Sequence, residues 1–250
     1  MRDPRSLHGA WASFQSHGFV EPAPALRCVV SRYWWARWDL TGQPDYVQLM
    51  VPYPNVQLTF SGDERWVRGV SRGRVTRALS GRGSVVGVAF RPGVFRRFLG
   101  APVESITDLS VAADSIFPGA AHTTDIADIA DLDEFLSRRL PAADPIGDEV
   151  AGWVDDIVAT RELQRVDQLT GRYNVSERQL QRLFAEHVGV GPKWVLRRFR
   201  LHEVTERMAG RSAVDWAVLA ADLGYADQAH LTRDFSNMFG EPPTIYAARY

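Results

Sequence analysis

Leu180-Gln181-Arg182-Leu183-Phe184 decides the fold of the second half of this chain, because Leu231-Thr232-Arg233-Asp234-Phe235 repeats its pattern 51 residues later. In both stretches a glycine follows the phenylalanine after four residues, and a proline follows the glycine after two more. A repeat at a fixed spacing is typical of one small structural unit that the chain builds twice. We therefore expect two related helical units, each presenting one arginine at the same position.

The first copy predicts a helix over residues 176–187 with two different faces. The apolar face carries Leu180, Leu183, Phe184 and Val188, and the polar face carries Glu177, Arg178, Gln181, Arg182 and Ala185. Such a helix is anchored to its own domain while its polar face enters the major groove of DNA. Arginine can contact guanine, and glutamine adenine, through two hydrogen bonds each. The alternative is an ordinary surface helix, whose outer face is polar in any protein.

The second copy favours the DNA interpretation over that alternative. Asp227 is suited to begin its helix as an N-cap, and Leu231 and Phe235 are suited to anchor it. Asn174 and Gly224 precede the two helices, and both residue types tolerate the positive φ of a tight turn. The repeat thus predicts two helix-turn-helix motifs, over about residues 163–187 and 213–239. The exposed side of the second helix would carry Gln228, Ala229, Thr232, Arg233 and Ser236, with His230 on the flank.

A continuous helix is expected between the two motifs. Pro192 suits the first turn of a helix, and about 17 residues at 1.5 Å each make a rod of roughly 25 Å. Two recognition helices on such a rod can reach successive major grooves, which lie about 34 Å apart on one face of DNA. Arg197 and Arg198 lie along the rod as candidate phosphate contacts, whereas Arg200 fits either a phosphate contact or an internal ion pair.

Composition argues against several classes of protein. With 250 residues, of which 45% are apolar, the chain is long enough for one large domain or two ordinary ones. It has no apolar run of 18 residues, so we expect no membrane-spanning helix. The charged start of the chain lacks the apolar stretch of a secretory signal, and the single Cys28 leaves no internal disulfide. These features favour a cytoplasmic protein.

Net charge alone does not indicate a partner. The formal net charge of −1 argues against a strongly basic nucleic-acid binder, so the clustering of arginines matters more than their sum. The six histidines form no pair at a spacing of four residues, and Cys28 has no second cysteine beside it. We therefore expect no metal site and no cofactor.

The first half of the chain is typical of a small β-barrel or sandwich. Apolar and aromatic stretches between residues 27 and 90 alternate with turn residues, which predicts several short strands. Residues 81–83 are expected to close a hairpin between strands at residues 75–79 and 85–90. Two prolines within residues 140–145 indicate a linker. The expected fold is therefore α+β with two domains: a β-rich domain with flanking helices over residues 1–143, and an all-α domain over residues 144–250.

Four tryptophans crowd the expected strands, namely Trp34, Trp35, Trp38 and Trp66. They are candidates for an aromatic pocket that binds a small apolar or cationic ligand. The alternative is that they fill the core of the β domain or a dimer face. Trp34 and Trp35 point to opposite faces of a strand, so at most one of the two lines any interior.

The helical half resembles the AraC/XylS family of bacterial transcription regulators. The resemblance rests on residues 175–184, 189–192, 200–201, 223–235 and 239–243, where order, spacing and turn residues all agree. It implies a helical domain with two helix-turn-helix motifs and double-stranded promoter DNA as the partner. The family's base-contacting positions fall on Arg178, Gln181 and Arg182 in the first motif and on Gln228, Ala229, His230 and Arg233 in the second, with Thr232 near the backbone.

The chain departs from the family at the position after each phenylalanine, where a lysine or arginine is common. Here these residues are Ala185 and Ser236, and each missing phosphate contact lowers the affinity for DNA. Asp234 adds a negative charge beside Arg233, or else orients that arginine. The first motif is therefore expected to supply most of the sequence-specific affinity.

Residues 88–93 and 99–102 resemble, more loosely, the β-rich domain that precedes this DNA-binding unit in some family members. That resemblance implies that the first half senses a small-molecule effector, forms a homodimer, or both. The primary hypothesis is a sequence-specific DNA-binding transcription regulator, not an enzyme, controlled by a ligand or partner of its first half. Two alternatives stay open: a first half that only dimerises or binds protein, and a small cytosolic enzyme or ligand-binding protein with a helical tail.

Overall fold

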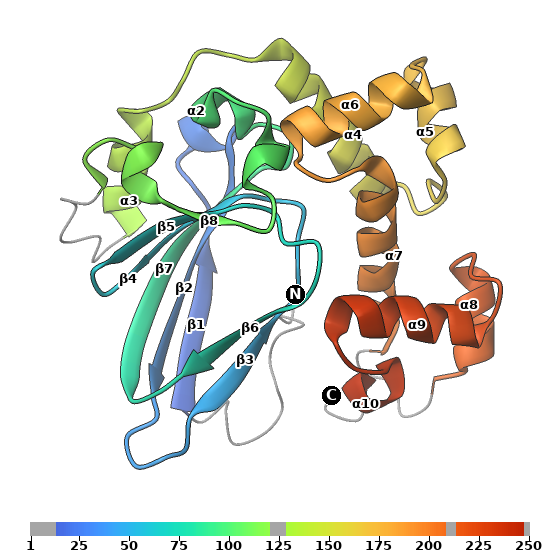
Figure 1. Cartoon of the computed structure of the whole chain (residues 1–250), viewed down its shortest axis with the longest axis horizontal. Helices are drawn as coiled ribbons and strands as arrows, with labels where there is room; N and C mark the ends of the chain where they lie inside the picture. The colour runs from blue at the N-terminus through green and yellow to red at the C-terminus, as the bar shows by residue number, and fades with distance from the viewer. Residues whose placement is uncertain (1–13, 121–128, 209–213, 248–250) are drawn as a thin grey trace.

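The computed structural model describes residues 14–120, 129–208 and 214–247, in which the strands lie in the first half and the longer helices follow them along the chain (Figure 1). This order confirms the α+β class expected from the sequence. The strands are β1 (Gln15–Val20), β2 (Val30–Asp39), β3 (Tyr46–Met50), β4 (Gln57–Ser61), β5 (Glu64–Arg68), β6 (Val75–Leu79), β7 (Arg82–Phe90) and β8 (Ser110–Ala112). The helices are α2 (Arg96–Leu99), α3 (Ile129–Ser137), α4 (Pro145–Ala159), α5 (Val166–Tyr173), α6 (Glu177–His187), α7 (Pro192–Met208), α8 (Trp216–Asp222), α9 (Gln228–Phe239) and α10 (Pro243–Ala247), with 3-10 turns η1 (Pro24–Leu26), η2 (Val103–Ile106) and η3 (Ala113–Ser115). Within the described ranges, no helix is long and apolar enough to cross a membrane.

A six-stranded antiparallel sheet in the order β1-β2-β7-β4-β5-β8 forms the main part of the first half. On one side of this sheet, Tyr33 and Phe90 are fully buried in a core that also takes in Leu132 and Leu136 of α3. The Tyr33 hydroxyl donates a hydrogen bond to Asp133 of α3 at 2.7 Å, which satisfies a polar group that burial would otherwise leave without a partner. Helix α3 therefore closes this side of the sheet.

Strands β3 and β6 form a separate two-stranded antiparallel sheet, which we call the ribbon. Tyr46 pairs with Leu79 at one end of the ribbon, and Met50 pairs with Val75 at the other. The hairpin expected between residues 75–79 and 85–90 is wrong, because β7 already pairs with β2 on one edge and with β4 on the other. β6 finds no free edge on β7 and pairs with β3 instead.

The helical half contains two apolar cores that share α7. Leu180 and Phe184 of α6 are fully buried in the first core, and Leu231 and Phe235 of α9 are fully buried in the second. The start of α7 belongs to the first core, its end belongs to the second, and Trp194 packs against both. The repeated sequence pattern therefore forms two structural units joined through one helix (Figure 1).

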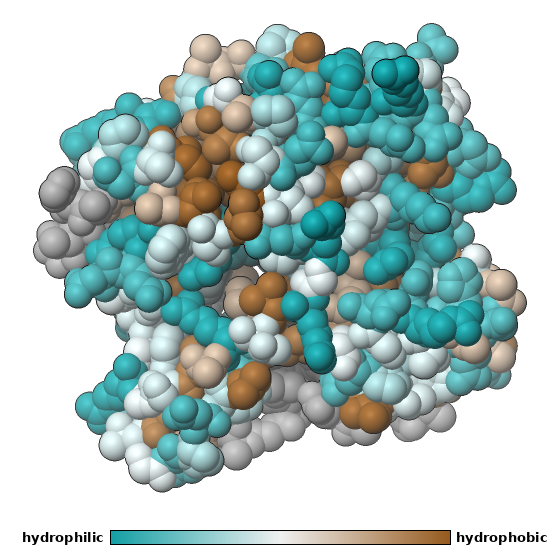
Figure 2. Space-filling model, viewed as in Figure 1, coloured by the Kyte–Doolittle hydropathy of each residue, from teal (hydrophilic) through white to brown (hydrophobic). Residues whose placement is uncertain are grey.

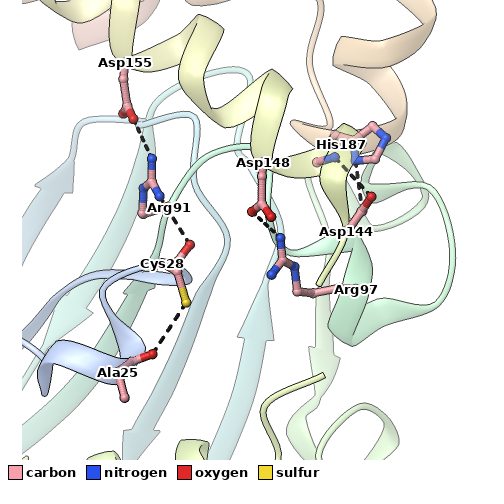
Figure 3. A network of polar contacts seen from close by, with 9 residues as sticks. Ala25, Cys28, Arg91, Arg97, Asp144, Asp148, Asp155 and His187 are labelled. Carbon is pink, nitrogen blue, oxygen red and sulfur yellow. Dashed lines mark hydrogen bonds and ion pairs between the residues drawn. The ribbon is translucent and has the colours of Figure 1, made fainter. Parts of the chain in front are cut away.

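Figure 3 shows how α4 is fastened to the first half of the chain. Arg91, which follows β7, donates a hydrogen bond to Asp155 at 2.5 Å, and Arg97 of α2 donates one to Asp148. Both carboxylates lie on α4, so two ion pairs bind this helix to the segment after the main sheet.

The same segment approaches α4 closely at Gly93. Its φ is 93°, and a Cβ there would lie 2.7 Å from the backbone nitrogen of Ala151, so glycine is required on both counts. Asp144 caps α4 by accepting a hydrogen bond from the backbone of Gly147 at 3.1 Å. The predicted division between residues 143 and 144 coincides with this cap, and the extent of each domain stays a prediction.

Candidate nucleic-acid interface and effector cleft

The first helix-turn-helix motif consists of α5, a turn at Asn174 and α6. Asn174 has a φ of 51°, the left-handed conformation that asparagine tolerates better than most residues. The hydroxyl of Ser176 accepts a hydrogen bond from the backbone of Gln179 at 3.2 Å and so caps α6. Both local features expected from the sequence are thus present, and they fix the angle between the two helices.

The outer face of α6 is available to a partner. Arg178, Gln181 and Arg182 are all exposed. Gln181 donates to Glu177 at 2.9 Å, and Arg182 donates to Glu186 at 3.2 Å. Exposed pairs of this kind contribute only about 0.3–0.5 kcal/mol on a helix, so DNA can displace them at little cost.

The second motif repeats this arrangement with different residues. The side chain of Asp215 caps α8 through the backbone nitrogens of Ala217 and Val218, both at 3.0 Å. Gly224 takes the turn with a φ of 71°, and Asp227 caps α9 by accepting from the backbone of His230 at 2.6 Å. The second recognition helix is therefore capped and turned as the repeat predicts.

The outer face of α9 is less basic than that of α6. Gln228, Ala229 and Arg233 are exposed, whereas Thr232 and His230 are half-buried. The His230 ring lies edge-on to Tyr225 at a centroid distance of 5.1 Å, which draws it away from the exposed face. Arginine is thus presented at one position of α9 and at two positions of α6.

Asp234 does not orient Arg233. Its carboxylate lies 3.8 Å from the guanidinium of Arg197 on α7, and this pair bridges α7 and α9. The acidic charge beside Arg233 therefore partly neutralises a second arginine that was expected to reach phosphate.

Of the two arginines predicted to contact phosphate, Arg198 is a correction. It is 5% exposed, its Nε donates to the carbonyl of Pro52, and its guanidinium lies 5.5 Å from the ring of Tyr53. Burial lowers the pKa of Arg198 to about 10. Arg198 is therefore a contact between α7 and the first half of the chain, because successive residues of a helix point in different directions and position 198 faces inward.

Arg200 is an internal contact rather than a phosphate contact. It donates to the carbonyl of Gln164 at 2.6 Å, and its guanidinium lies 5.2 Å from the Tyr225 ring. It thereby connects the loop before α5, in the first motif, to the second motif.

Figure 2 shows that the surface over the helical half is mainly hydrophilic on the face that it draws, while apolar residues gather nearer α2.

The second candidate site is a cleft between the ribbon and the main sheet, with an open volume of about 770 Å³ that includes solvent at its mouth. Three of the four tryptophans proposed for a pocket, Trp34, Trp35 and Trp38, line it, whereas Trp66 lies on β5 outside it. The expectation that at most one of Trp34 and Trp35 lines an interior is therefore wrong for this cleft. The other lining residues are Gln15, His17, Phe19, Ala36, Arg37, Gln48, Met50, Arg77, Leu79 and Val85.

Strand periodicity explains how the cleft is built. Trp34, Ala36 and Trp38 alternate along β2, and they share the side of the sheet opposite to the buried Tyr33. Trp34 and Trp38 lie over Gly87 and Gly83 of β7, where a Cβ would come within 2.2 Å of an indole ring. The glycines thus let both indoles lie down on the sheet and form a flat aromatic floor.

The arginines in the lining of the cleft are Arg37 and Arg77, and none of the described residues that line it is acidic. Arg77 projects from the ribbon, and its nearest carboxylate partner, Glu64, is 3.9 Å away and largely exposed. Burial, followed by the charge of Arg77, lowers the pKa of the neighbouring Arg68. A second positive charge from a ligand would add to this repulsion. Among the residues that the structure describes, no group of His, Cys, Asp or Glu is arranged to hold a metal ion.

Two capped helices that each follow a tight turn, share one connecting helix and expose arginine define a DNA-binding protein with two helix-turn-helix motifs. Comparison with known families agrees: residues 169–249 match the helix-turn-helix domain family, and residues 19–112 match a domain of unknown function (DUF6597). The helical half is an AraC-type helix-turn-helix domain, which confirms the resemblance seen in the sequence. The chain is therefore a DNA-binding transcription regulator.

Several solved structures are similar to this chain. ToxT from Vibrio cholerae is 11% identical with a TM-score of 0.41, over 82% of this chain and 98% of that one. Unsaturated fatty acid bound ToxT from the same organism is 9% identical with a TM-score of 0.40, over 82% and 95%. The C-terminal domain of AraT, a response regulator from Geobacillus stearothermophilus, is 20% identical with a TM-score of 0.37, over 43% and 87%. No curated protein matches this chain.

Proposed function

We propose that this regulator reads a specific promoter sequence through α6 and α9, and that a small molecule in the cleft controls its binding to DNA. The observation that carries the first part is the exposed row of Arg178, Gln181 and Arg182 on a capped helix whose opposite face is fully buried. Arg233 adds one contact from α9, with Gln228 and Ala229 beside it.

The DNA part is tested by selecting bound fragments from a random pool and measuring the affinity for the enriched site. Arg182→Ala and Arg233→Ala are each expected to weaken binding by about 1–3 kcal/mol and to relax the selected sequence at one position. Arg138→Ala is the matched control, because Arg138 is an arginine of similar exposure in the turn that follows α3, far from both motifs in the chain, and it also pairs with a glutamate four residues away. Unchanged affinity in both recognition-helix variants would sink the assignment.

The effector part rests on the cleft between the ribbon and the main sheet. Its floor of two indoles suits a ligand with a flat apolar body, because aromatic faces bury large areas of such a molecule. Arg77 and Arg37 in its lining disfavour a cation, so the ligand class narrows to neutral or anionic molecules.

The effector part is tested by a thermal-shift screen of metabolites against the full chain. A true effector raises the unfolding temperature of the wild-type protein and of Trp66→Phe, but not of Trp38→Ala. Trp66 is the control because it carries the same side chain on the same sheet outside the cleft. A stabilising compound that acts equally on all three proteins binds elsewhere and removes the cleft from the proposal.

A homodimer is the second candidate role of the first half, and the edge strand β1 favours it. Phe19 and Val20 at the end of β1 are 39% and 40% exposed, and among the described strands β1 pairs only with β2. An exposed strand edge with large apolar side chains is a common site for pairing between chains. Sedimentation of wild type against Val20→Lys tests this, and an unchanged monomer in both excludes the dimer through β1.

A further inference from the structure

The ribbon has a special position in the molecule, because it forms one wall of the cleft and shares no hydrogen-bonded ladder with the main sheet among the described strands. Its inward residues, Gln48 and Met50 on β3 and Arg77 and Leu79 on β6, alternate as strand geometry requires. A two-stranded sheet is only marginally stable in isolation. The contacts at the two ends of the ribbon therefore determine its position relative to the main sheet.

The end of β3 leads directly into the helical half. Val51, the residue after β3, packs against the core of the second helix-turn-helix motif. The carbonyl of Pro52 accepts the hydrogen bond from buried Arg198, and the Tyr53 ring meets Phe199 edge-on at a centroid distance of 5.5 Å. Three consecutive residues thus fix this end of the ribbon to α7 and to the second core.

The start of β6 is fixed to the same region. Arg74, the residue before β6, donates to the carbonyl of Gly240 at 3.1 Å. Gly240 ends α9, the second recognition helix, and a Cβ at this position would lie 2.3 Å from the Arg74 guanidinium. Slightly upstream, the carbonyl of Arg72 accepts from the indole of Trp194 at 3.0 Å.

We propose that the ribbon couples the cleft to the second recognition helix: a molecule in the cleft displaces the ribbon, and the displacement loosens the contacts of residues 51–53 and 74 with α7, α9 and the second core. This inference rests on the proposed effector cleft and adds the route by which the cleft acts. A ligand shifts such an equilibrium only through different affinities for the two arrangements. Here the two arrangements are the ribbon with its end contacts formed and the ribbon with these contacts loosened, and the ligand is expected to bind the second more tightly.

The coupling has to work in both directions, because linkage between two sites is reciprocal. If a molecule in the cleft loosens the helical half, then loosening the helical half by mutation strengthens binding in the cleft. This consequence is measurable without DNA and without knowing the natural effector.

The test is a titration of the full chain with the apolar fluorescent anion 1-anilinonaphthalene-8-sulfonate. Arg74→Ala and Val51→Ser each release one end of the ribbon without touching the cleft lining, and each is expected to tighten dye binding about threefold. Arg72→Ala and Val47→Ser are the matched controls: the Arg72 side chain pairs with Asp108 and not with the helical half, and Val47 is 61% exposed on β3. Both controls are expected to bind the dye as the wild type does.

A variant with a filled cleft provides a second test, which needs no ligand. Ala36→Phe adds an aromatic ring inside the cleft, so it lowers dye binding and imitates an occupied state. Its effect on DNA affinity is expected to have the same sign as that of Arg74→Ala, and the double variant is expected to match the larger single effect, because both act on one equilibrium.

The outcomes distinguish the coupling through the ribbon from ligand binding in the cleft, on which the coupling rests. Dye binding that Ala36→Phe lowers but that is equal in wild type, Arg74→Ala and Val51→Ser overturns the coupling and leaves the cleft as a binding site. Dye binding that Ala36→Phe does not lower removes the cleft itself, and the coupling with it. Additive effects of Ala36→Phe and Arg74→Ala on DNA affinity also overturn the coupling, even if Arg182→Ala and Arg233→Ala confirm the DNA contacts.

Discussion

The two helix-turn-helix motifs share one sequence pattern but are attached to the rest of the protein in different ways. Gly189 and Gly240 occupy equivalent positions, and the carbonyl of each accepts a hydrogen bond from the first half of the chain. Gly189 receives it from the half-buried hydroxyl of Thr107 at 2.6 Å, and Gly240 from the exposed guanidinium of Arg74 at 3.1 Å. The same unit is thus firmly fixed in its first copy and lightly held in its second.

Other contacts follow the same division. The first motif buries Val70 of the first half completely in its core, and Glu186 of α6 forms an ion pair with Arg96 of α2 at 3.0 Å. The core of the second motif takes in a half-buried Val51 from the first half, and α9 is held at its end by the exposed Arg74. The first recognition helix is therefore held in place by more contacts than the second, although the two motifs share one sequence pattern. One motif can thus keep a fixed position while the other adjusts its position on DNA.

The largest test of this comparison is the loss of the equivalent core phenylalanines, Phe184→Ala and Phe235→Ala. Both rings are fully buried, so each loss is expected to cost about 3–5 kcal/mol in the free energy of unfolding measured by urea. Because the first core includes part of the first half, Phe184→Ala is expected to disturb the packing of Val70 as well. A second, separate unfolding transition in Phe235→Ala but not in Phe184→Ala would sharpen the difference. The reverse pattern would break it.

A smaller effect is expected from the two helix caps. Ser176→Ala and Asp227→Ala each remove the side chain that accepts the first free backbone donor of a recognition helix, at a cost of about 1 kcal/mol. If α6 is held by its surroundings and α9 is not, Asp227→Ala lowers DNA affinity more than Ser176→Ala at equal loss of stability. Ser105→Ala is a control, because its hydroxyl bonds only its own 3-10 turn at η2.

The smallest effect that we expect is on the pH dependence of folding stability. His187 in the first copy corresponds to Met238 in the second; it is 3% exposed, and Asp144 lies 3.6 Å from its Nδ1 (Figure 3). Burial lowers the pKa of His187 below its usual value of 6.5. The folded state therefore binds the proton less well than the unfolded state, so this contribution to stability is complete above pH 6.5 and is lost as pH falls through the lower pKa.

We expect His187→Met, which places the residue of the second copy in the first, to flatten the dependence of the unfolding temperature on pH below pH 6.5. The change is expected to be small, since the charges of Asp144 and Glu186 oppose the effect of burial on the pKa of His187. Equal slopes in wild type and variant would contradict a buried neutral histidine. His230→Met, on the half-exposed flank of α9, is the comparison variant.

The sequence was sufficient for the features that local chemistry decides. The caps at Ser176 and Asp227, the left-handed turns at Asn174 and Gly224, and the helix from Pro192 all follow from residue type at a position, and all are present. Arg178, Gln181 and Arg182 are exposed on one face as the period of 3.6 requires.

Pairings over long range were beyond the sequence. The predicted hairpin at residues 81–83 failed because the turn is local, whereas the choice of β3 as the partner of β6 depends on which edges of β7 are taken. Strands β1 and β8 and helix α10 lie outside the expected elements; β8 has three residues and α10 has five, which is too short to show a periodic pattern. Arg198 was assigned to phosphate because nothing in its neighbours shows that Pro52 and Tyr53 lie above it.

The shared helix α7 determines the rotation and the spacing of the two recognition helices relative to each other. It runs without interruption from one core to the other, so inserting a single residue would turn the second motif by about 100° and advance it by about 1.5 Å relative to the first. If both recognition helices contact DNA as we propose, such a turn moves α9 off the face of the double helix that α6 contacts. In the proposed complex, the length of α7 therefore determines whether the spacing of the two recognition helices matches the helical repeat of DNA.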